Sequence, residues 1–222
     1  MADRLTGAIR CGGLQLAGWW SIRATTAKRI LEGLRRKMTA LARCTWADGD
    51  PVMAAYHDTE WGIPLHESRA LWEMLMLEGF QAGLSWRTIL HRREGFRRAF
   101  DGFVPEVVAA YDEAKIAAMM QDAGIIRARA KIEATIGNAR AYLRMAQQGE
   151  DFAQFVWSHV NGLPRLGDGL TVPASDPTSL ALSKALKQRG FKFVGAVTVY
   201  AFMQAVGMVN DHAIDCPQRN AC

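Results

Sequence analysis

Residues 68–86 read SRALWEMLMLEGFQAGLSW and combine a helical pattern with an acid that has no obvious partner. Leu71, Met74 and Leu75 recur at i, i+3 and i+4, the spacing of one helix face. The next position on that face, i+7, is Glu78. A carboxylate among hydrophobic residues is costly to bury unless something pairs with it. Taken alone, the stretch favours a Glu that reaches water at a helix end and a Trp in the core; the rest of the chain changes this interpretation.

The composition favours one well-cored domain and places the positive charge at the amino terminus. The chain has 222 residues, of which half are hydrophobic, enough for one domain or for two small lobes around a cleft. No run approaches the ~20 continuous apolar residues of a membrane span. Of the formal net charge of +5, residues 1–37 hold eight Lys and Arg against two acids, so residues 38–222 carry −1. The high pI is therefore weak support for nucleic-acid binding by the main body.

Residues 1–37 lack a core pattern, and we expect a basic, poorly ordered extension ahead of a domain at 38–222. An Arg-rich, acid-poor amino terminus also resembles a transit peptide. A third interpretation, which we prefer, is that translation starts at Met38. No secretory signal is evident, so we expect reduced thiols and a cytoplasmic, monomeric protein. The four cysteines are Cys11, Cys44, Cys216 and Cys222.

Hydrophobic periodicity and capping residues predict an all-α protein with many short helices. The expected helices are 52–60, 67–77, 85–100, 105–111, 113–121, 128–146, 152–160, 180–188 and 194–206. Glycines and prolines make 161–178 a loop between two halves. The only strand candidate, a weak one, lies near 170–172.

Four potential metal ligands stand at the two ends of the expected domain. Cys44 and His57 form a C-x12-H pattern, and His212 and Cys216 form H-x3-C. Two Cys and two His satisfy a tetrahedral zinc site with no open position, which would be structural and would join the termini. The spacing differs from that of an ordinary zinc finger, and two buried cysteines with two unrelated histidines remain an alternative.

The glycine-flanked segment GFKFVG, residues 190–195, separates two expected helices and is typical of a helical hairpin. Backbone N–H groups exposed by Gly190 and Gly195, the following helix N-terminus and Lys192 could hold a DNA phosphate without reading bases. An ordinary helix–turn–helix connection is the commoner alternative.

Aromatic side chains and one acid form a third set. A pocket that reads a nucleobase needs flat faces for stacking and polar groups at the edge of the base. Tyr56, Trp61 and Trp86 offer the faces, and Glu78 can accept a hydrogen bond from an exocyclic amine and favours a cation. Core packing is the alternative for each aromatic taken singly; Trp46 is assigned to the core or left unassigned.

Seven segments together resemble the 3-methyladenine DNA glycosylase I family, a branch of the helix-hairpin-helix glycosylases. They are RCTW (43–46), AYHDTEWG (55–62), LEGFQAGLSW (77–86), DAGIIR (122–127), IGNARAY (136–142), LKQRGFKFVG (186–195) and VNDH (209–212). The resemblance runs in order from about Cys44 to Cys216 and leaves out the residues before Met38.

The resemblance implies two helical lobes around a base-binding cleft, a helix-hairpin-helix element and one structural zinc ion. It implies that the zinc ligands are Cys44, His57, His212 and Cys216. It also implies that Glu78 hydrogen-bonds the excised base as the catalytic residue, between Tyr56 and Trp86 and beside Trp61. The DNA backbone would be held by Gly190, Lys192 and Gly195. Met53 stands where the family pattern has a tyrosine, and Asp211 is not assigned as a catalyst because the family is thought to lack the catalytic aspartate of related glycosylases.

The function implied is hydrolysis of the N-glycosidic bond of 3-methyladenine in double-stranded, alkylated DNA, with release of the free base. A module that recognises damaged DNA without cutting it is the main alternative. A zinc-organised scaffold that binds a protein partner through residues 1–37 is another. A catalytic zinc hydrolase is weaker, because four protein ligands leave no position for an activated water.

Overall fold

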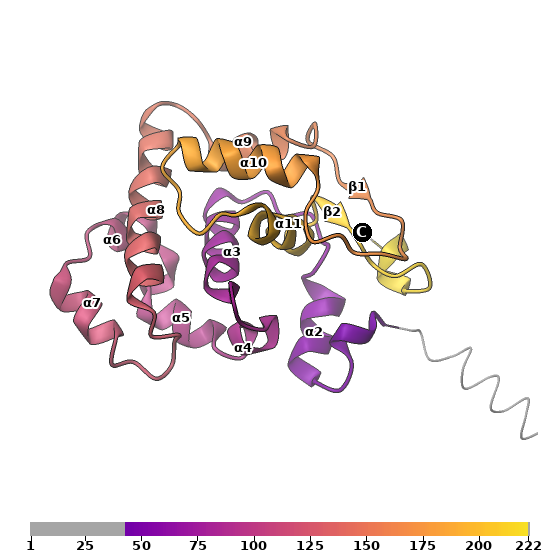
Figure 1. Cartoon of the computed structure of the whole chain (residues 1–222), viewed down its shortest axis with the longest axis horizontal. Helices are drawn as coiled ribbons and strands as arrows, with labels where there is room; N and C mark the ends of the chain where they lie inside the picture. The colour runs from indigo at the N-terminus through magenta and orange to yellow at the C-terminus, as the bar shows by residue number, and fades with distance from the viewer. Residues whose placement is uncertain (1–42, 222) are drawn as a thin grey trace, which may run out of the picture. The chain divides into compact units, whose positions relative to one another are not determined.

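The computed structural model describes residues 43–221, and these residues form a helical domain (Figure 1). The expected extension at 1–37, Met38, Cys11 and Cys222 lie outside the described residues. None of the described helices is both long and apolar enough to cross a membrane.

The expectation of many short helices is confirmed in the described part of the chain. The helices are α2 (Pro51–Thr59), α3 (Ser68–Gln81), α4 (Trp86–Leu90), α5 (Arg93–Ala99), α6 (Pro105–Ala109), α7 (Glu113–Met119), α8 (Arg129–Gln147), α9 (Phe152–Ser158), α10 (Pro177–Gln188) and α11 (Ala196–Ala205). Three short 3-10 turns, η1 (Thr45–Ala47), η2 (Asp101–Phe103) and η3 (Pro217–Asn220), complete the helical elements. Each of the nine expected helices overlaps an observed one.

Helix α3 lies at the centre of the fold (Figure 1). Every residue from Leu71 to Phe80 except Glu73 is buried, as expected of a helix covered on all sides. It packs against α4, α8, α9 and α11. The helix was expected to end at Leu77, but it continues to Gln81 because Phe80 also enters the core, against Phe96. Glu78 therefore stands inside the central helix.

A single helix over 85–100 was the wrong prediction. The helix is interrupted at His91 and Arg92, where a turn separates α4 from α5. Leu90 and Phe96 are both buried on the two sides of this break. Six residues apart on one continuous helix, they would point about 120° from each other. The turn brings both side chains into the core.

The strand candidate near 170–172 was also wrong. The two described strands, β1 (Arg165–Leu166) and β2 (Val209–Asn210), form a short parallel pair. The pair ties the segment before α10 to the segment after α11, a pairing between distant parts of the chain that no local pattern reveals.

Candidate active site and metal centre

A cavity of about 280 Å³ opens between α2, α3, α4 and α11. This volume is close to the lower end of the range usual for small-molecule sites, about 300–1,000 Å³. The lining residues are Trp46, Tyr56, Trp61, Glu78, Gln81, Trp86, Val172, Ala201 and Gln204. The structure thus brings the predicted acid and all three predicted aromatic residues to one cavity, although they come from separate elements.

Glu78 is the one carboxylate among the residues that line the cavity. Its side chain is 4% exposed, and no other described residue donates a hydrogen bond or forms an ion pair with it. Burial raises the pKa of the Glu78 carboxyl to about 8, because removal from water disfavours the charged form. The carboxyl therefore holds its proton at neutral pH more readily than an exposed glutamate does.

The aromatic side chains form the walls of the cavity. The rings of Tyr56 and Trp86 are 5.2 Å apart at an interplanar angle of 46°. Burial, with a further contribution from Glu78, raises the pKa of the Tyr56 hydroxyl well above its ordinary value. The indole Nε1 of Trp86 is buried and has no partner among the residues described. The rings of these side chains give the cavity flat walls on which a planar ligand can stack.

Five residues of the cavity lining were missed at the sequence level: Trp46, Gln81, Val172, Ala201 and Gln204. Trp46 lies edge-on to Trp61 with ring centroids 5.0 Å apart, and its position two residues after Cys44 was the available signal. Gln81 and Gln204 carried no signal. Gln81 was expected beyond the end of its helix, and Gln204 comes from α11, more than 100 residues away in sequence.

The four predicted metal ligands meet in one buried cluster. The ligand atoms of Cys44, His57, His212 and Cys216 all lie within 4.8 Å of one another. Cys216 Sγ is 3.5 Å from both His57 Nε2 and His212 Nδ1, and Cys44 Sγ is 3.6 Å from His212 Nδ1. Zinc bonds of about 2.3 Å to sulfur and 2.05 Å to nitrogen, at a tetrahedral angle, separate the two atoms by about 3.6 Å. The donor set and its spacing therefore fit a four-coordinate metal ion.

Neighbouring groups orient both histidines. His57 Nδ1 donates to Asp58 Oδ1 at 2.8 Å. The pKa of the Asp58 carboxyl is lowered to about 2, mainly by its hydrogen bond with Arg43 and to a lesser degree by His57. His212 Nε2 donates to the Trp61 carbonyl oxygen at 3.2 Å. These contacts leave His57 Nε2 and His212 Nδ1 as the free acceptors, as expected of metal-binding histidines.

The cluster of two cysteines and two histidines shares a wall with the cavity. Trp61 packs edge-on against the ring of His212 with centroids 4.5 Å apart, and Trp46 packs against His57 at 5.4 Å. Both tryptophans also line the cavity. The two buried histidines therefore pack against two of the aromatic walls of the cavity.

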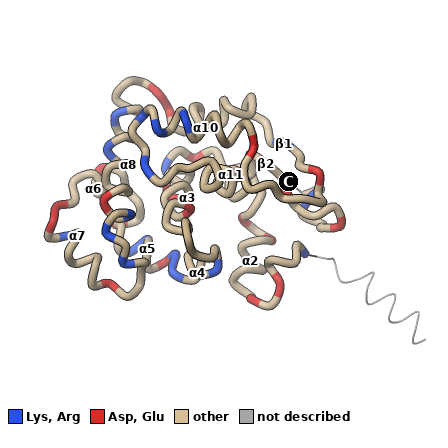
Figure 2. Tube along the Cα trace, in the orientation of Figure 1, with Lys and Arg blue, Asp and Glu red and all other residues tan. Residues whose placement is uncertain are grey.

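The segment 189–195, here called the hairpin turn, connects α10 to α11. Gly190 adopts a φ of 93°, a region that favours glycine, and Gly195 is the N-cap of α11. Lys192 is exposed and forms no ion pair with any described residue, and the same holds for Lys184 and Lys187 on the adjacent α10. Figure 2 shows these basic positions along α10 and the turn that follows it.

The comparisons with known proteins agree with this site. The family model described as methyladenine glycosylase matches residues 46–220. The chain belongs to this family. It is 55% identical over 179 residues to DNA-3-methyladenine glycosylase 1 of Escherichia coli, covering 79% of this chain and 96% of that protein. It is 49% identical over 178 residues to DNA-3-methyladenine glycosylase of Haemophilus influenzae, again covering 79% and 96%.

Solved structures of methyladenine glycosylases have the same fold. A crystal structure of 3-methyladenine DNA glycosylase I superposes with a TM-score of 0.78 at 52% identity and covers 79% of this chain and 98% of the other. A structure of the Staphylococcus aureus enzyme, described as the basis of its 3-methyladenine recognition, gives a TM-score of 0.76 at 41% identity, with 81% and 97% covered. The range matched by the family model, residues 46–220, spans the cavity lining and the hairpin turn.

Two residues singled out against the family pattern lie outside the cavity lining. Met53 is 6% exposed and belongs to the hydrophobic core. Asp211 is buried and accepts hydrogen bonds from the Tyr200 hydroxyl at 2.7 Å and from Gln204 Nε2 at 2.8 Å. Both hydrogen bonds reach Asp211 Oδ2 from neighbouring side chains of the protein. Asp211 therefore has partners within the protein, whereas Glu78 has none among the described residues.

Proposed function

We propose that this chain is a base-excision repair glycosylase that hydrolyses the N-glycosidic bond of 3-methyladenine in alkylated, double-stranded DNA. The observation that carries the proposal is the buried Glu78 carboxyl, which faces an aromatic cavity without a partner from the described part of the protein. Relatives at 55% and 49% identity are named for this activity. Another relative was crystallised in complex with 3-methyladenine.

Recognition depends on charge and stacking. N3-methylation makes the purine of the nucleotide cationic, and a flipped base costs least to unstack when it is damaged. Tyr56 and Trp86 stack on the base, and Trp61 lines the pocket. Glu78 ionises as the cation enters and attracts it, because a nearby opposite charge favours the charged form of a carboxyl. An uncharged adenine lacks this interaction.

The reaction follows from the same contacts. The bond between the sugar carbon and the base nitrogen breaks, and its electron pair neutralises the departing purine. Water forms the new bond to the oxocarbenium-like sugar carbon and loses its proton to solvent. Glu78 orients the base and assists departure only to the extent that its contact strengthens in the transition state. The cationic base is already a good leaving group, so less acid catalysis is required than for a normal base.

The buried Cys and His cluster is proposed to bind one structural zinc ion. The ligands Cys44, His57, His212 and Cys216 fill all four positions of a tetrahedral ion. When bound, the metal would supply a cross-link between the two ends of the domain and leave no position for water. The ligands thus contribute to the fold and to the tryptophan walls, and not to the bond cleavage.

The hairpin turn is proposed to hold the DNA backbone as part of a helix-hairpin-helix element between two lobes. Gly190 and Gly195 leave the backbone accessible, and Lys192 contributes a positive charge that pairs with no acid among residues 43–221. Such contacts orient the duplex without reading its sequence. A domain at 38–222, a monomeric state and a cytoplasmic location stay predictions.

The test is incubation of the purified chain with alkylated duplex DNA, followed by chromatography of the released bases. Free 3-methyladenine is expected from alkylated DNA and no free adenine from the same duplex without alkylation. Retention of alkylated DNA without release would instead favour the recognition module. The absence of both retention and release would favour the scaffold that acts through residues 1–37.

A further inference from the structure

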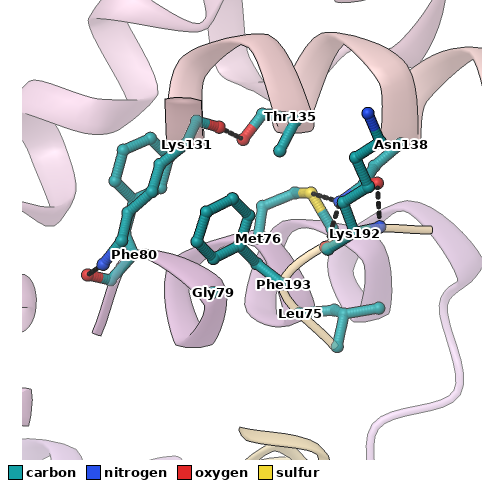
Figure 3. A pocket seen from close by; sticks show the side chains of 10 residues that line it. Leu75, Met76, Gly79, Phe80, Lys131, Thr135, Asn138, Lys192 and Phe193 are labelled. Atoms are coloured by element: carbon teal, nitrogen blue, oxygen red, sulfur yellow. Dashed lines mark hydrogen bonds between the residues drawn. The ribbon is translucent and has the colours of Figure 1, made fainter. Parts of the chain in front are cut away.

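The residues in Figure 3 form a packed junction between α3, α8 and the hairpin turn. The cavity among them holds only about 10 Å³, room for roughly one water molecule. It is therefore not a ligand site. The junction joins two elements of the proposed site, since α3 carries Glu78 and the hairpin turn carries Lys192.

Asn138 is the polar centre of this junction. It is 2% exposed in the middle of α8. Its Oδ1 accepts a hydrogen bond from the Lys192 backbone N–H at 2.8 Å, and its Nδ2 donates to the Lys192 carbonyl oxygen at 3.0 Å (Figure 3). Nδ2 also lies 3.3 Å from Met76 Sδ, on α3. One amide thus fixes both backbone groups of Lys192 and contacts the central helix.

The next residue, Phe193, contacts the central helix directly. Its φ of 56° lies in the left-handed region, which costs a non-glycine residue about 1 kcal/mol or more unless its surroundings hold it. Its Cβ and carbonyl oxygen lie 3.6 Å from where a Cβ on Gly79 would stand. The position beside Glu78 is therefore in contact with the hairpin turn.

Lys131 closes the junction from the other end. Its Nζ donates to the carbonyl oxygens of Phe80 at 2.9 Å and Ala82 at 2.6 Å. These carbonyls belong to the last turn of α3, whose unpaired acceptors need donors. The same Nζ lies 5.9 Å from the centre of the Phe193 ring. Asn138 and Lys131, seven residues apart on one face of α8, thus connect α3 to the hairpin turn.

We infer that Asn138 is a positioning residue that sets the distance between the DNA-backbone contact at Lys192 and the base pocket at Glu78. The inference rests on the proposed function, in which the hairpin turn holds DNA. An asparagine is a poor choice for the interior of a helix, and here it supplies the acceptor for the backbone N–H of Lys192 and the donor for the carbonyl oxygen of the same residue. Aspartate retains only the acceptor, and leucine retains neither.

The experiment compares Asn138→Asp and Asn138→Leu with wild type and with Thr135→Val. Thr135 is a matched control because it lines the same cavity on α8, but its hydroxyl bonds only to the Lys131 carbonyl within the helix. Two affinities are measured: that for free 3-methyladenine, from tryptophan fluorescence, and that for duplex DNA. Release of 3-methyladenine from alkylated DNA gives kcat/KM.

Both Asn138 variants are expected to lose about tenfold in duplex affinity and in kcat/KM, while their affinity for the free base stays within about twofold of wild type. Thr135→Val is expected to match wild type in all three. Retained free-base affinity also reports that the pocket is folded. Unchanged duplex affinity in both Asn138 variants would overturn the inference, and so would an equal loss of free-base affinity.

A second measurement does not depend on any variant. Amide hydrogen exchange of the wild-type protein is expected to show protection of the Lys192 N–H, because Asn138 accepts its hydrogen bond. Rapid exchange of the Lys192 N–H would contradict a stable hydrogen bond to Asn138. A wild-type protein that binds DNA but releases no base would refute the proposed reaction. The two affinity measurements would still test the positioning role of Asn138, because neither depends on base release.

Discussion

The candidate metal centre and the candidate base pocket both contain buried polar groups, and Trp46 and Trp61 lie between them, yet the two sites differ in how the protein surrounds those polar groups. In the metal centre, protein groups orient both histidines and the ligand atoms face one another at metal-binding distances. In the pocket, Glu78 has no partner within residues 43–221. Buried polar groups are normally satisfied. In the Cys and His cluster, the protein orients both histidine rings so that the four ligand atoms converge, whereas in the cavity no described residue pairs with the one carboxylate.

The largest effect should follow removal of a metal ligand. Cys216→Ser, or chelation of the wild-type protein, is expected to abolish stoichiometric zinc binding and lower the melting temperature by roughly 10 °C or more, since a structural metal contributes several kcal/mol to folding. Metal analysis and calorimetry measure the two quantities.

Asp215→Asn is the matched control, because Asp215 is exposed beside Cys216 and supplies no ligand atom to the cluster. Its zinc content and melting temperature should equal those of wild type. A Cys216→Ser protein that kept both values would show that the two clusters do not differ as proposed.

The unpaired carboxyl should make the folded protein less stable at high pH. The Glu78 pKa is about 8 in the folded state, against about 4.5 when unfolded. A raised carboxyl pKa stabilises the folded state fully below about pH 4.5, and this contribution is lost as the pH rises to about 8. The free energy of unfolding of wild type, relative to Glu78→Gln, should therefore fall by several kcal/mol between pH 5 and 8.

Chemical denaturation across this pH range measures the difference. Glu94→Gln is the control, because Glu94 is exposed at the surface and should show almost no such trend. A Glu78→Gln protein whose stability followed that of wild type at every pH would mean that Glu78 has a partner after all.

The aromatic walls should contribute unequally to base affinity. Trp86→Ala is expected to weaken binding of free 3-methyladenine by about tenfold to a hundredfold, because stacking on one base is worth about 1–3 kcal/mol. Trp46→Ala should have a smaller effect, since Trp46 is 38% exposed and also packs on His57. Fluorescence titration measures both, and a reversed order would place the stacking surface on the metal side of the pocket.

The smallest effect should come from the hairpin turn. Lys192→Ala is expected to weaken duplex binding a few-fold and to lower the slope of log affinity against log salt by about 0.9, the value for one phosphate contact. Lys115→Ala, whose lysine pairs with Asp101, should leave the slope unchanged. An unchanged slope for Lys192→Ala would remove this lysine from the DNA contact.

The sequence predicted that the four Cys and His residues would meet, and it predicted four of the nine residues that line the cavity, because these residues belong to recognisable chemical types within short motifs. It did not predict what depends on distant pairing. The parallel contact of β1 with β2 and the entry of Gln204 into the cavity arise from packing between segments far apart in the chain. The continuation of α3 past Leu77 also depended on tertiary burial of Phe80, which local pattern could not reveal.

The central claim is that Glu78 acts as the anionic partner of a cationic base, and the pH dependence of base release tests it most directly. The value of kcat/KM reports ionisations of the free enzyme. On alkylated DNA, wild type should show kcat/KM rising with pH to a plateau above about pH 8, where Glu78 is ionised. Glu78→Gln should be slower by roughly a hundredfold, the cost typical of one lost electrostatic contact, and should lack the rise. A Glu78→Gln enzyme with the rate and pH profile of wild type would contradict the account.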